Sequence, residues 1–264
     1  MNYKALVFDL DGTLTPSAAQ HCYPEVAPVL RQAKENGLHI FIATGRSSFF
    51  VMKDIREETG VEAMVTANGM IVLDKDENIL AFHPIAQKTF LEFVQDSREK
   101  DYPAGFKFKD QIVVFNGYER FVARYGSAKV NQYLIKNAED CTDPTVFGET
   151  VDVFMFGDPD YFFSLQERFP DLTVILARHQ ACEAYPKGYN KFTGLQDLFR
   201  SYGLKEEEVI AFGDSENDEE MLKRCGLGIA MGNGTEGAKK AADFVTLPCD
   251  QDGIGYALRH FGLI

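Results

Sequence analysis

The sequence predicts an α/β fold: a Rossmann-like parallel sheet core with an inserted α+β cap domain. Short apolar runs alternate with helical patterns at both ends of the chain, which favours a parallel sheet covered by helices on both faces. The middle of the chain is rich in aromatic residues and breaks this alternation. We therefore expect one α/β core made of residues 1–83 and 187–264, and an α+β cap at residues 84–186.

The first part of the core alternates strand-like and helix-like patterns. The apolar run Ala5–Phe8 predicts a buried strand, and Gly37 is expected to end the helix that follows it. The expected elements are strands at Ala5–Phe8, Leu38–Ala43 and Ala63–Thr66, helices with the spacing Val26, Val29, Leu30, Ala33 and over Phe49–Glu58, and a hairpin of Met70–Leu73 and Ile79–Phe82.

The inserted segment mixes strand and helix signals, and the core pattern returns after Lys187. In the insert we expect strands at Phe106–Phe108, Ile112–Phe115, Val151–Phe156 and Thr173–Leu176, and helices at Thr89–Glu99, Lys129–Ala138 and Tyr161–Arg168. In the returning core we expect helices at Phe192–Tyr202 and Ile254–Phe261, and strands at Val209–Phe212, Gly228–Met231 and Phe244–Leu247.

Charge and composition argue against several classes of protein, among them nucleic-acid binders and membrane proteins. A net charge of −13 without a Lys/Arg-rich run argues against nucleic-acid binding, which needs a basic face. No apolar run is long enough to span a membrane, and the amino terminus lacks a signal-peptide pattern, so a cytoplasmic location is expected. The five cysteines are scattered and odd in number, which favours reduced thiols over a disulfide framework or a zinc site.

Functional-looking residues follow three of the apolar strands. Ligands of parallel α/β sheets bind beyond the carboxyl ends of the strands, so groups at those ends are expected to converge. The three groups are Asp9-Leu10-Asp11-Gly12-Thr13, Thr44-Gly45-Arg46 and Gly213-Asp214-Ser215-Glu216-Asn217-Asp218.

The pair Asp9 and Asp11 suits phosphoryl transfer. One carboxylate can attack phosphorus to form an aspartyl-phosphate, while a second protonates the leaving alcohol and then activates water. Gly12 allows the tight turn that brings backbone amides to a phosphate. Asp and Gly are also common turn formers, so an acidic turn without catalytic function is the alternative.

An aspartate approaches a phosphate dianion more easily when a cation offsets the repulsion. Mg²⁺ prefers oxygen ligands and often uses one or two carboxylates, so Asp9 and Asp214 are candidate direct ligands. Asp218, one helical turn beyond Asp214, is expected to support the site through water or by holding a cation. An acid-rich helix start is the alternative interpretation of this segment.

Phosphate also needs hydrogen-bond donors. Thr44 offers a hydroxyl, Gly45 exposes backbone amides, and Lys191 begins a helix from which its ammonium would stabilise transition-state charge. A lone lysine at such a place is more often solvated surface. The run Gly232–Gly237 also matches GxGxxG, but too little chain follows it for a dinucleotide-binding half, and we interpret it as a tight turn.

Together the motifs resemble the haloacid dehalogenase superfamily, in particular its Cof-type sugar-phosphatase branch with a large inserted cap. Four motifs match in order: DLDGT at Asp9–Thr13, ATGR at Ala43–Arg46, KGYNK at Lys187–Lys191 and GDSEND at Gly213–Asp218. The tail Asp250–Ile264 is also similar to that branch, whereas the cap matches only in its layout.

The resemblance implies a hydrolase, a magnesium-dependent phosphatase acting on a small phosphorylated metabolite, with a sugar phosphate expected. It implies Asp9 as nucleophile and Asp11 as general acid/base, with Thr44, Lys191 and Asn217 on the phosphate. Magnesium would be held by Asp9, the main-chain carbonyl of Asp11, and Asp214, with Asp218 in support. Arg46 matches a family position and is counted among the substrate-binding candidates without an assigned contact.

Specificity is expected to reside on the cap, where a mobile lid would exclude water and contact the leaving group. Arg178, His179 and Glu183 are the candidates, although each is as readily explained as ordinary surface. No obligate protein partner is evident.

Two other functions remain open. Leu14-Thr15-Pro16 is reminiscent of the phosphomannomutase branch, which would need a second phosphate site, with Arg120, Arg124 and Arg178 as candidates. A receiver-like signalling module also pairs a phosphorylatable aspartate with a lysine, but it needs neither Asp11 nor a long inserted lid.

Overall fold

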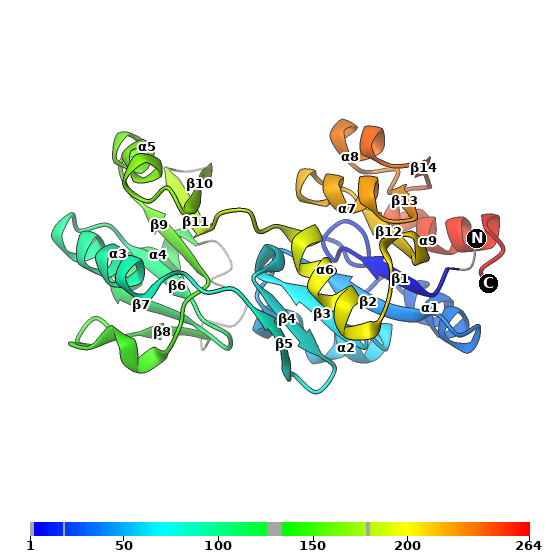
Figure 1. Ribbon diagram of the computed structural model, residues 1–264, viewed down its shortest axis with the longest axis horizontal. Coiled ribbons are helices and arrows are strands. Elements are labelled where there is room, and N and C mark those ends of the chain that lie inside the picture. The colour runs from blue at the N-terminus through cyan, green and yellow to red at the C-terminus, as the bar shows by residue number, and fades with distance from the viewer. Residues whose placement is uncertain (1–2, 18, 126–133, 178–179) are drawn as a thin grey trace. The chain divides into compact units, whose positions relative to one another are not determined.

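A computed structural model describes residues 3–17, 19–125, 134–177 and 180–264. The chain divides into two compact units, and Figure 1 labels the elements of each. Unit 1 consists of Met1–Phe82 and Tyr189–Ile264, and unit 2 is the continuous segment His83–Gly188. Two distant stretches of sequence therefore build one unit, with the other inserted between them.

Unit 1 is built on one sheet with strand order β14-β13-β12-β1-β2-β3-β4-β5. Pairing is parallel from β14 through β3, whereas β4 and β5 add an antiparallel hairpin at one edge. The strands are β1 (Ala5–Phe8), β2 (His39–Ala43), β3 (Ala63–Thr66), β4 (Ile71–Asp74), β5 (Ile79–Phe82), β12 (Val209–Gly213), β13 (Leu227–Ala230) and β14 (Phe244–Val245).

Helices cover both faces of this sheet (Figure 1). Successive strand residues point to opposite faces, so Leu6 and Phe8 join one apolar cluster while Ala5 and Val7 join the other. The helices are α1 (Val26–Glu35), α2 (Lys53–Thr59), α6 (Lys191–Tyr202), α7 (Glu219–Arg224), α8 (Glu236–Ala241) and α9 (Gly253–His260). Residues of α1, α2 and α9 belong to the first cluster, and those of α6, α7 and α8 to the second.

The central strand β1 determines where a ligand site is possible. Its neighbours are β2 on one side and β12 on the other, and these come from opposite parts of the chain. Such a reversal of strand order leaves a crevice at the carboxyl ends of the strands. The ends of β1, β2 and β12 therefore lie at one edge of the sheet, as the sequence predicted, and the end of β3 lies at the same edge.

Unit 2 has a sheet with strand order β10-β11-β9-β6-β7-β8. Phenylalanines dominate its core, where α3 and α5 contribute to the same apolar cluster as the strands. The elements are α3 (Gln87–Glu99), β6 (Ala104–Lys107), β7 (Ile112–Asn116), α4 (Tyr118–Arg124), β8 (Ile135–Asn137), β9 (Asp152–Phe156), α5 (Pro159–Arg168), β10 (Leu172–Ala177) and β11 (Ala181–Pro186). The α/β fold class is confirmed, and the inserted unit is of α+β type.

Three local predictions were wrong or incomplete. The helix expected at Phe49–Glu58 starts only at Lys53, after a short 3₁₀ turn over Ser48–Phe50. Val51 and Met52 are extended, because arginine side chains bind the carbonyls of Ser48, Phe50 and Val51 that a continuous helix would use.

In unit 2, the helix expected at Lys129–Ala138 is wrong at its end, where Ile135–Asn137 forms β8 and pairs in parallel with β7. The rest of that stretch lies largely outside the described residues. Neither α4 nor β11 was predicted, since short amphipathic segments carry weak periodic signals.

Among the described residues, no helix is both long and apolar enough to cross a membrane.

Candidate active site

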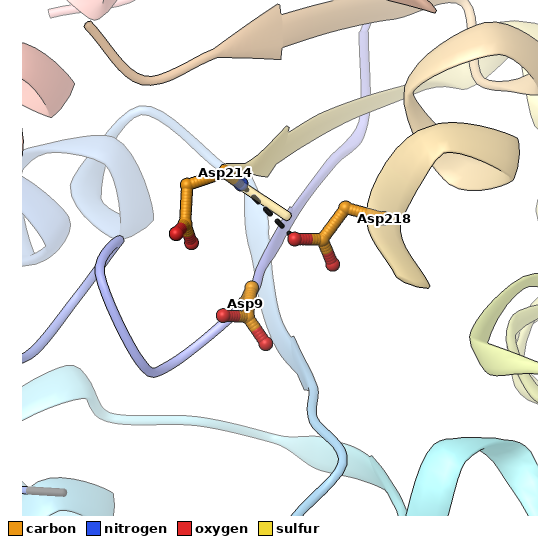
Figure 2. Close-up of side chains that lie close together, drawn as sticks. All are labelled: Asp9, Asp214 and Asp218. Atoms are coloured by element: carbon orange, nitrogen blue, oxygen red, sulfur yellow. Dashed lines mark hydrogen bonds between the residues drawn. The ribbon is translucent and has the colours of Figure 1, made fainter. Parts of the chain in front are cut away.

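Three carboxylates from two separate parts of the chain converge at the edge of the sheet in unit 1. Asp9 follows β1, Asp214 follows β12, and Asp218 lies in the turn after Asp214. Figure 2 shows their side chains directed toward a common region. One oxygen from each carboxylate lies within 4.8 Å of the other two. The Asp9 amide donates to the Phe212 carbonyl at 2.9 Å, which extends the β1–β12 pairing up to the site.

Lys191 supplies the cation of the cluster. It is the first residue of α6, whose amino terminus is capped by Asn190 and Thr193 through reciprocal side-chain bonds. The Lys191 side chain is only 1% exposed, and its Nζ donates to Asp9 Oδ1 at 2.5 Å and to Asp218 Oδ1 at 2.7 Å. Burial by itself lowers the pKa of Lys191, but the two carboxylates raise it above its ordinary value. The ammonium is therefore charged at neutral pH.

Asp218 organises the turn after β12 (Figure 2, dashed line). Its Oδ2 accepts from the amides of Asp214 and Ser215, each at 3.0 Å, while Oδ1 accepts from Lys191. The Asp218 carboxylate is fully buried, so these contacts hold it in one orientation. This contact set fits the supporting role that the sequence indicated for Asp218 rather than direct ion ligation.

Burial makes the carboxylates of Asp9 and Asp214 hard to ionise. Desolvation raises the pKa of Asp9 to about 7, although Lys191 acts in the opposite direction and Asp218 adds to the increase. Desolvation also raises the pKa of Asp214 to about 6, helped by the Asp218 charge and opposed by a hydrogen bond from Thr13. That bond runs from Thr13 Oγ1 to Asp214 Oδ1 at 3.0 Å. Both groups are thus suited to bind a cation that replaces a proton.

The charges and donor atoms fit a divalent metal ion. When ionised, Asp9, Asp214 and Asp218 carry three negative charges, and Lys191 pairs with two of them as one positive charge. One divalent cation would balance the remaining two charges. Oxygen ligands are those that magnesium prefers. Asp9 and Asp214 would hold the ion, because both oxygens of Asp218 already accept hydrogen bonds.

Asp11 lies in the same turn and is held by an arginine. Arg46 Nε donates to Asp11 Oδ2 at 2.7 Å, and Arg46 Nη2 donates to Asp11 Oδ1 at 2.6 Å. The sequence placed Arg46 among the substrate-binding candidates and gave it no contact. In the structure its guanidinium binds the predicted general acid/base.

The remaining predicted phosphate ligands lie at neighbouring strand ends. Thr44 is buried after β2, and its Oγ1 accepts from the Arg46 amide at 3.1 Å, which leaves the hydroxyl proton to donate. Gly45 lies against Asn68, whose Oδ1 would be 2.9 Å from a Cβ at position 45. Asn217 donates from Nδ2 to Asn68 Oδ1 at 3.0 Å. These contacts leave the phosphate-binding roles of Thr44, Gly45 and Asn217 as predictions.

Sequence reasoning assigned no role to three residues that shape the site. Thr13 binds Asp214, and Asn68 joins the loops after β3 and β12. Asn233 Nδ2 donates to the Gly12 carbonyl at 2.9 Å, which ties the GxGxxG turn to the Asp9 loop. Asn68 follows an apolar strand, so the rule that singled out Asp9 and Thr44 also points to it.

Gly12 shows how tightly these loops pack. Its φ of +86° is a conformation that side chains rarely adopt, and a Cβ there would lie 2.5 Å from Asp214 Oδ2. Glycine is therefore required both by the turn and by the neighbouring carboxylate.

The structure describes only one of the three residues that were predicted to set specificity on the cap. Arg178 and His179 lie outside the described residues. Within unit 2, Glu183 accepts from Lys107 Nζ at 2.7 Å, and the nearby Lys107 charge lowers the pKa of Glu183 to about 2. Lys107 also pairs with the buried Asp152 at 2.5 Å. The role of Glu183 in specificity stays a prediction.

Two of the arginines considered for a mutase, Arg120 and Arg124, are also engaged within unit 2. Arg120 Nη2 pairs with Asp101 Oδ1 at 2.5 Å, and the Arg124 guanidinium lies 4.4 Å from the centre of the Phe156 ring.

A family model for haloacid dehalogenase-like hydrolases matches residues 6–258, which includes the whole cluster described above. The chain belongs to this family. This confirms the resemblance to the haloacid dehalogenase superfamily. It also confirms the predicted enzyme class, a phosphoric monoester hydrolase of the haloacid dehalogenase type. Membership in a hydrolase family argues against the receiver-like signalling alternative.

Similar proteins agree with this assignment. The phosphatase YitU of Bacillus subtilis (strain 168), named for 5-amino-6-(5-phospho-D-ribitylamino)uracil, is 42% identical over 270 residues, covering 97% of this chain and 96% of YitU. Phosphatase YwpJ of the same organism is 26% identical, covering 97% of this chain and 99% of YwpJ. A solved sugar phosphatase of subclass IIB of the haloacid dehalogenase (HAD) superfamily is 29% identical with a TM-score of 0.80, covering 99% and 100% of the two chains.

Proposed function

We propose that this hydrolase is a magnesium-dependent phosphatase that releases phosphate from a small phosphorylated sugar or polyol through an aspartyl-phosphate on Asp9. The observation that carries the proposal is the buried cluster in which Lys191 contacts Asp9 while Asp214 and Asp218 lie beside them. The sugar or polyol class is supported by the sugar phosphatase and the ribitylamino-uracil phosphatase among the similar proteins.

In the first step, an oxygen of Asp9 forms a bond to phosphorus while the ester P–O bond breaks. The electron pair of that bond goes to the leaving oxygen, and Asp11 donates the proton that makes it an alcohol. We assign the attack to the Asp9 oxygen that Lys191 does not bind, because Lys191 holds Oδ1 in place. Lys191 also stabilises the negative charge around phosphorus.

In the second step, the oxygen of water bonds to phosphorus and the P–O bond to Asp9 breaks. Asp11, now deprotonated, takes a proton from the water, so the enzyme returns to its starting state and free phosphate leaves. Magnesium bound by Asp9 and Asp214 would offset the repulsion between carboxylate and phosphate. Unit 2 is proposed to select the leaving group, as expected for an inserted cap.

The proposal is tested by measuring phosphate release from a panel of sugar phosphates, polyol phosphates, nucleotides and 5-amino-6-(5-phospho-D-ribitylamino)uracil. We expect release that requires Mg²⁺ and falls at least about 10²-fold when the metal is chelated. The largest kcat/KM is expected on a sugar or polyol phosphate. Isomerisation of a sugar phosphate without net phosphate release would favour the mutase alternative, and no turnover of any compound would overturn the proposal.

Magnesium affinity should depend on pH. Because the pKa of Asp9 is raised to about 7 and that of Asp214 to about 6, protons compete with the ion for both carboxylates. Apparent affinity is expected to fall as pH decreases below about 7, by up to about tenfold per pH unit for each proton displaced. Calorimetry at pH 5.5, 6.5 and 7.5 measures this directly, in buffers of different ionisation enthalpy to count the protons released.

The matched control for this titration is Asp214→Asn, which removes one ligand together with its proton. This variant should bind Mg²⁺ more weakly at pH 7.5 and release fewer protons than the wild type. An affinity that does not change between pH 5.5 and 7.5 would show that neither carboxylate exchanges a proton for the ion.

A further inference from the structure

The contact between Arg46 and Asp11 has a geometry that a surface ion pair rarely has. Two nitrogens of the guanidinium meet the two oxygens of the carboxylate, at 2.7 Å and 2.6 Å. This fork-to-fork arrangement suits the ionised carboxylate, the form that Asp11 reaches as it gives up its proton, and it fixes both the position and the rotation of that group. The Arg46 side chain is only 15% exposed, so water competes poorly for these hydrogen bonds.

Arg46 is itself held from two other directions. Its Nη1 donates to the Ala19 carbonyl at 3.0 Å and to the Phe50 carbonyl at 3.4 Å. Its backbone amide donates to Thr44 Oγ1 at 3.1 Å, just beyond the end of β2. The guanidinium is thus anchored to the loop after β1 and to the 3₁₀ turn at Ser48–Phe50. Because these contacts hold the guanidinium in place at the edge of the sheet, they also fix where the Asp11 carboxylate lies.

These contacts leave Arg46 little capacity to bind phosphate itself. An arginine has five N–H donors on three nitrogens, and contacts within the protein use donors on all three. Asp11, in contrast, lies in a loop turn and has its side chain 33% exposed, so it needs an external constraint to stay in one orientation. A proton donor displaced by about 1 Å loses about 10²-fold in rate.

We infer that Arg46 is the positioning residue of Asp11: it acts on the reaction by orienting the general acid/base and does not contact the substrate. This inference rests on the proposed phosphatase function and deepens it. It predicts that substitution of Arg46 lowers kcat/KM most for substrates whose leaving oxygen most needs a proton. A nitrophenolate leaves with little help, whereas the anion of an unsubstituted phenol needs protonation more strongly.

The test measures kcat/KM for a graded series of substituted phenyl phosphates, from 4-nitrophenyl to phenyl phosphate. Because kcat/KM covers the steps up to release of the phenol, it isolates the transfer in which Asp11 is the acid. We expect Arg46→Gln to lower kcat/KM about 10- to 10²-fold for phenyl phosphate and less than about threefold for 4-nitrophenyl phosphate. The plot of log kcat/KM against leaving-group pKa therefore becomes steeper.

Four further variants separate orientation from other effects. Arg46→Lys keeps the charge but not the fork, so it should behave like Arg46→Gln. Asp11→Asn should make the plot of log kcat/KM against leaving-group pKa steeper still. The double variant Arg46→Gln/Asp11→Asn should lose no more kcat/KM than Asp11→Asn alone. Arg56→Gln is the structural control, because Arg56 also binds the carbonyls of Ser48 and Val51 in this segment, and we expect its slope to be unchanged.

Three outcomes would overturn the inference while the proposed function stands: an equal loss across the series in Arg46→Gln, a loss that adds fully to that of Asp11→Asn, or a wild-type slope in Arg46→Lys. A wild-type enzyme that hydrolyses none of the series with Mg²⁺ would instead overturn the proposed function and the inference with it. Thermal unfolding of each variant shows whether a loss reflects misfolding.

Discussion

Asp9→Asn should abolish phosphate release and leave the protein folded. The amide cannot attack phosphorus, and loss of a nucleophile costs about 10⁴-fold or more in kcat. The variant is also expected to be at least as stable as the wild type in the absence of metal at pH 8. The reason is that burial raises the pKa of Asp9, so its ionised form opposes folding at that pH.

The direction of the stability effect follows from linkage. A carboxyl group whose pKa is higher in the folded protein favours folding at low pH and loses that contribution as the pH rises through about 7. The neutral amide removes the part of this pH dependence that Asp9 contributes, whereas the raised pKa of Asp214 still contributes its own part. Chemical unfolding at pH 5.5 and 8 without metal measures it, and phosphate release measures the catalytic loss.

Asp9→Glu is the matched control, since it keeps the charge and moves it by one methylene group. Its kcat should fall about 10²-fold or more, because attack on phosphorus requires close alignment of the carboxylate. Activity of Asp9→Asn within about tenfold of wild type would exclude Asp9 as the nucleophile.

Lys191→Met should have the second largest effect, and it should affect stability as well as activity. The ammonium is 1% exposed and neutralises the buried carboxylates of Asp9 and Asp218. Removing one partner of a buried ion pair costs about 3–5 kcal/mol, because the charges left behind remain desolvated. Since the pKa of Lys191 is raised, the lost stabilisation applies throughout the neutral pH range.

The same change removes a cation from the region where phosphoryl charge develops, so kcat should fall about 10²- to 10³-fold. Unfolding in urea with a chelator present and steady-state kinetics with Mg²⁺ present measure the two effects separately. Lys223→Met, at an exposed lysine in the last turn of α7, is the matched control. It should change neither the free energy of unfolding nor kcat by much. A stable and fully active Lys191→Met would show that the buried ammonium serves neither folding nor catalysis.

The sequence predicted the core of the site because the relevant signals are local. An apolar run that ends in an aspartate, such as Ala5–Phe8 before Asp9, indicates both a buried strand and a polar group at its carboxyl end. The same pattern identified Thr44 and Asp214. Parallel pairing then required these ends to share one edge, as the structure has it.

Elements whose boundaries depend on hydrogen bonds from side chains or on pairing with another strand were predicted less well. The helix expected from Phe49 is interrupted because Arg46 and Arg56 bind carbonyls in the Ser48–Val51 segment. Strand β8 exists because Ile135 pairs beside Ile112 of β7 and is buried there. Neither effect is visible in hydrophobic periodicity, because the first depends on hydrogen bonds from nearby arginine side chains and the second on pairing with a separate strand.

The sequence by itself determined the fold class, the strand ends that carry chemistry and the types of side chain found there. Only the tertiary structure decided which of those side chains contact one another. Lys191 lies 182 residues from Asp9 in sequence, and its buried pairing with Asp9 and Asp218 depends on β12 and α6 packing next to β1 and β3. The Arg46–Asp11 fork likewise joins two loops. The physical reason is that hydrophobic periodicity is a property of a segment, whereas hydrogen-bond partners, burial and the resulting pKa shifts are properties of the assembled fold.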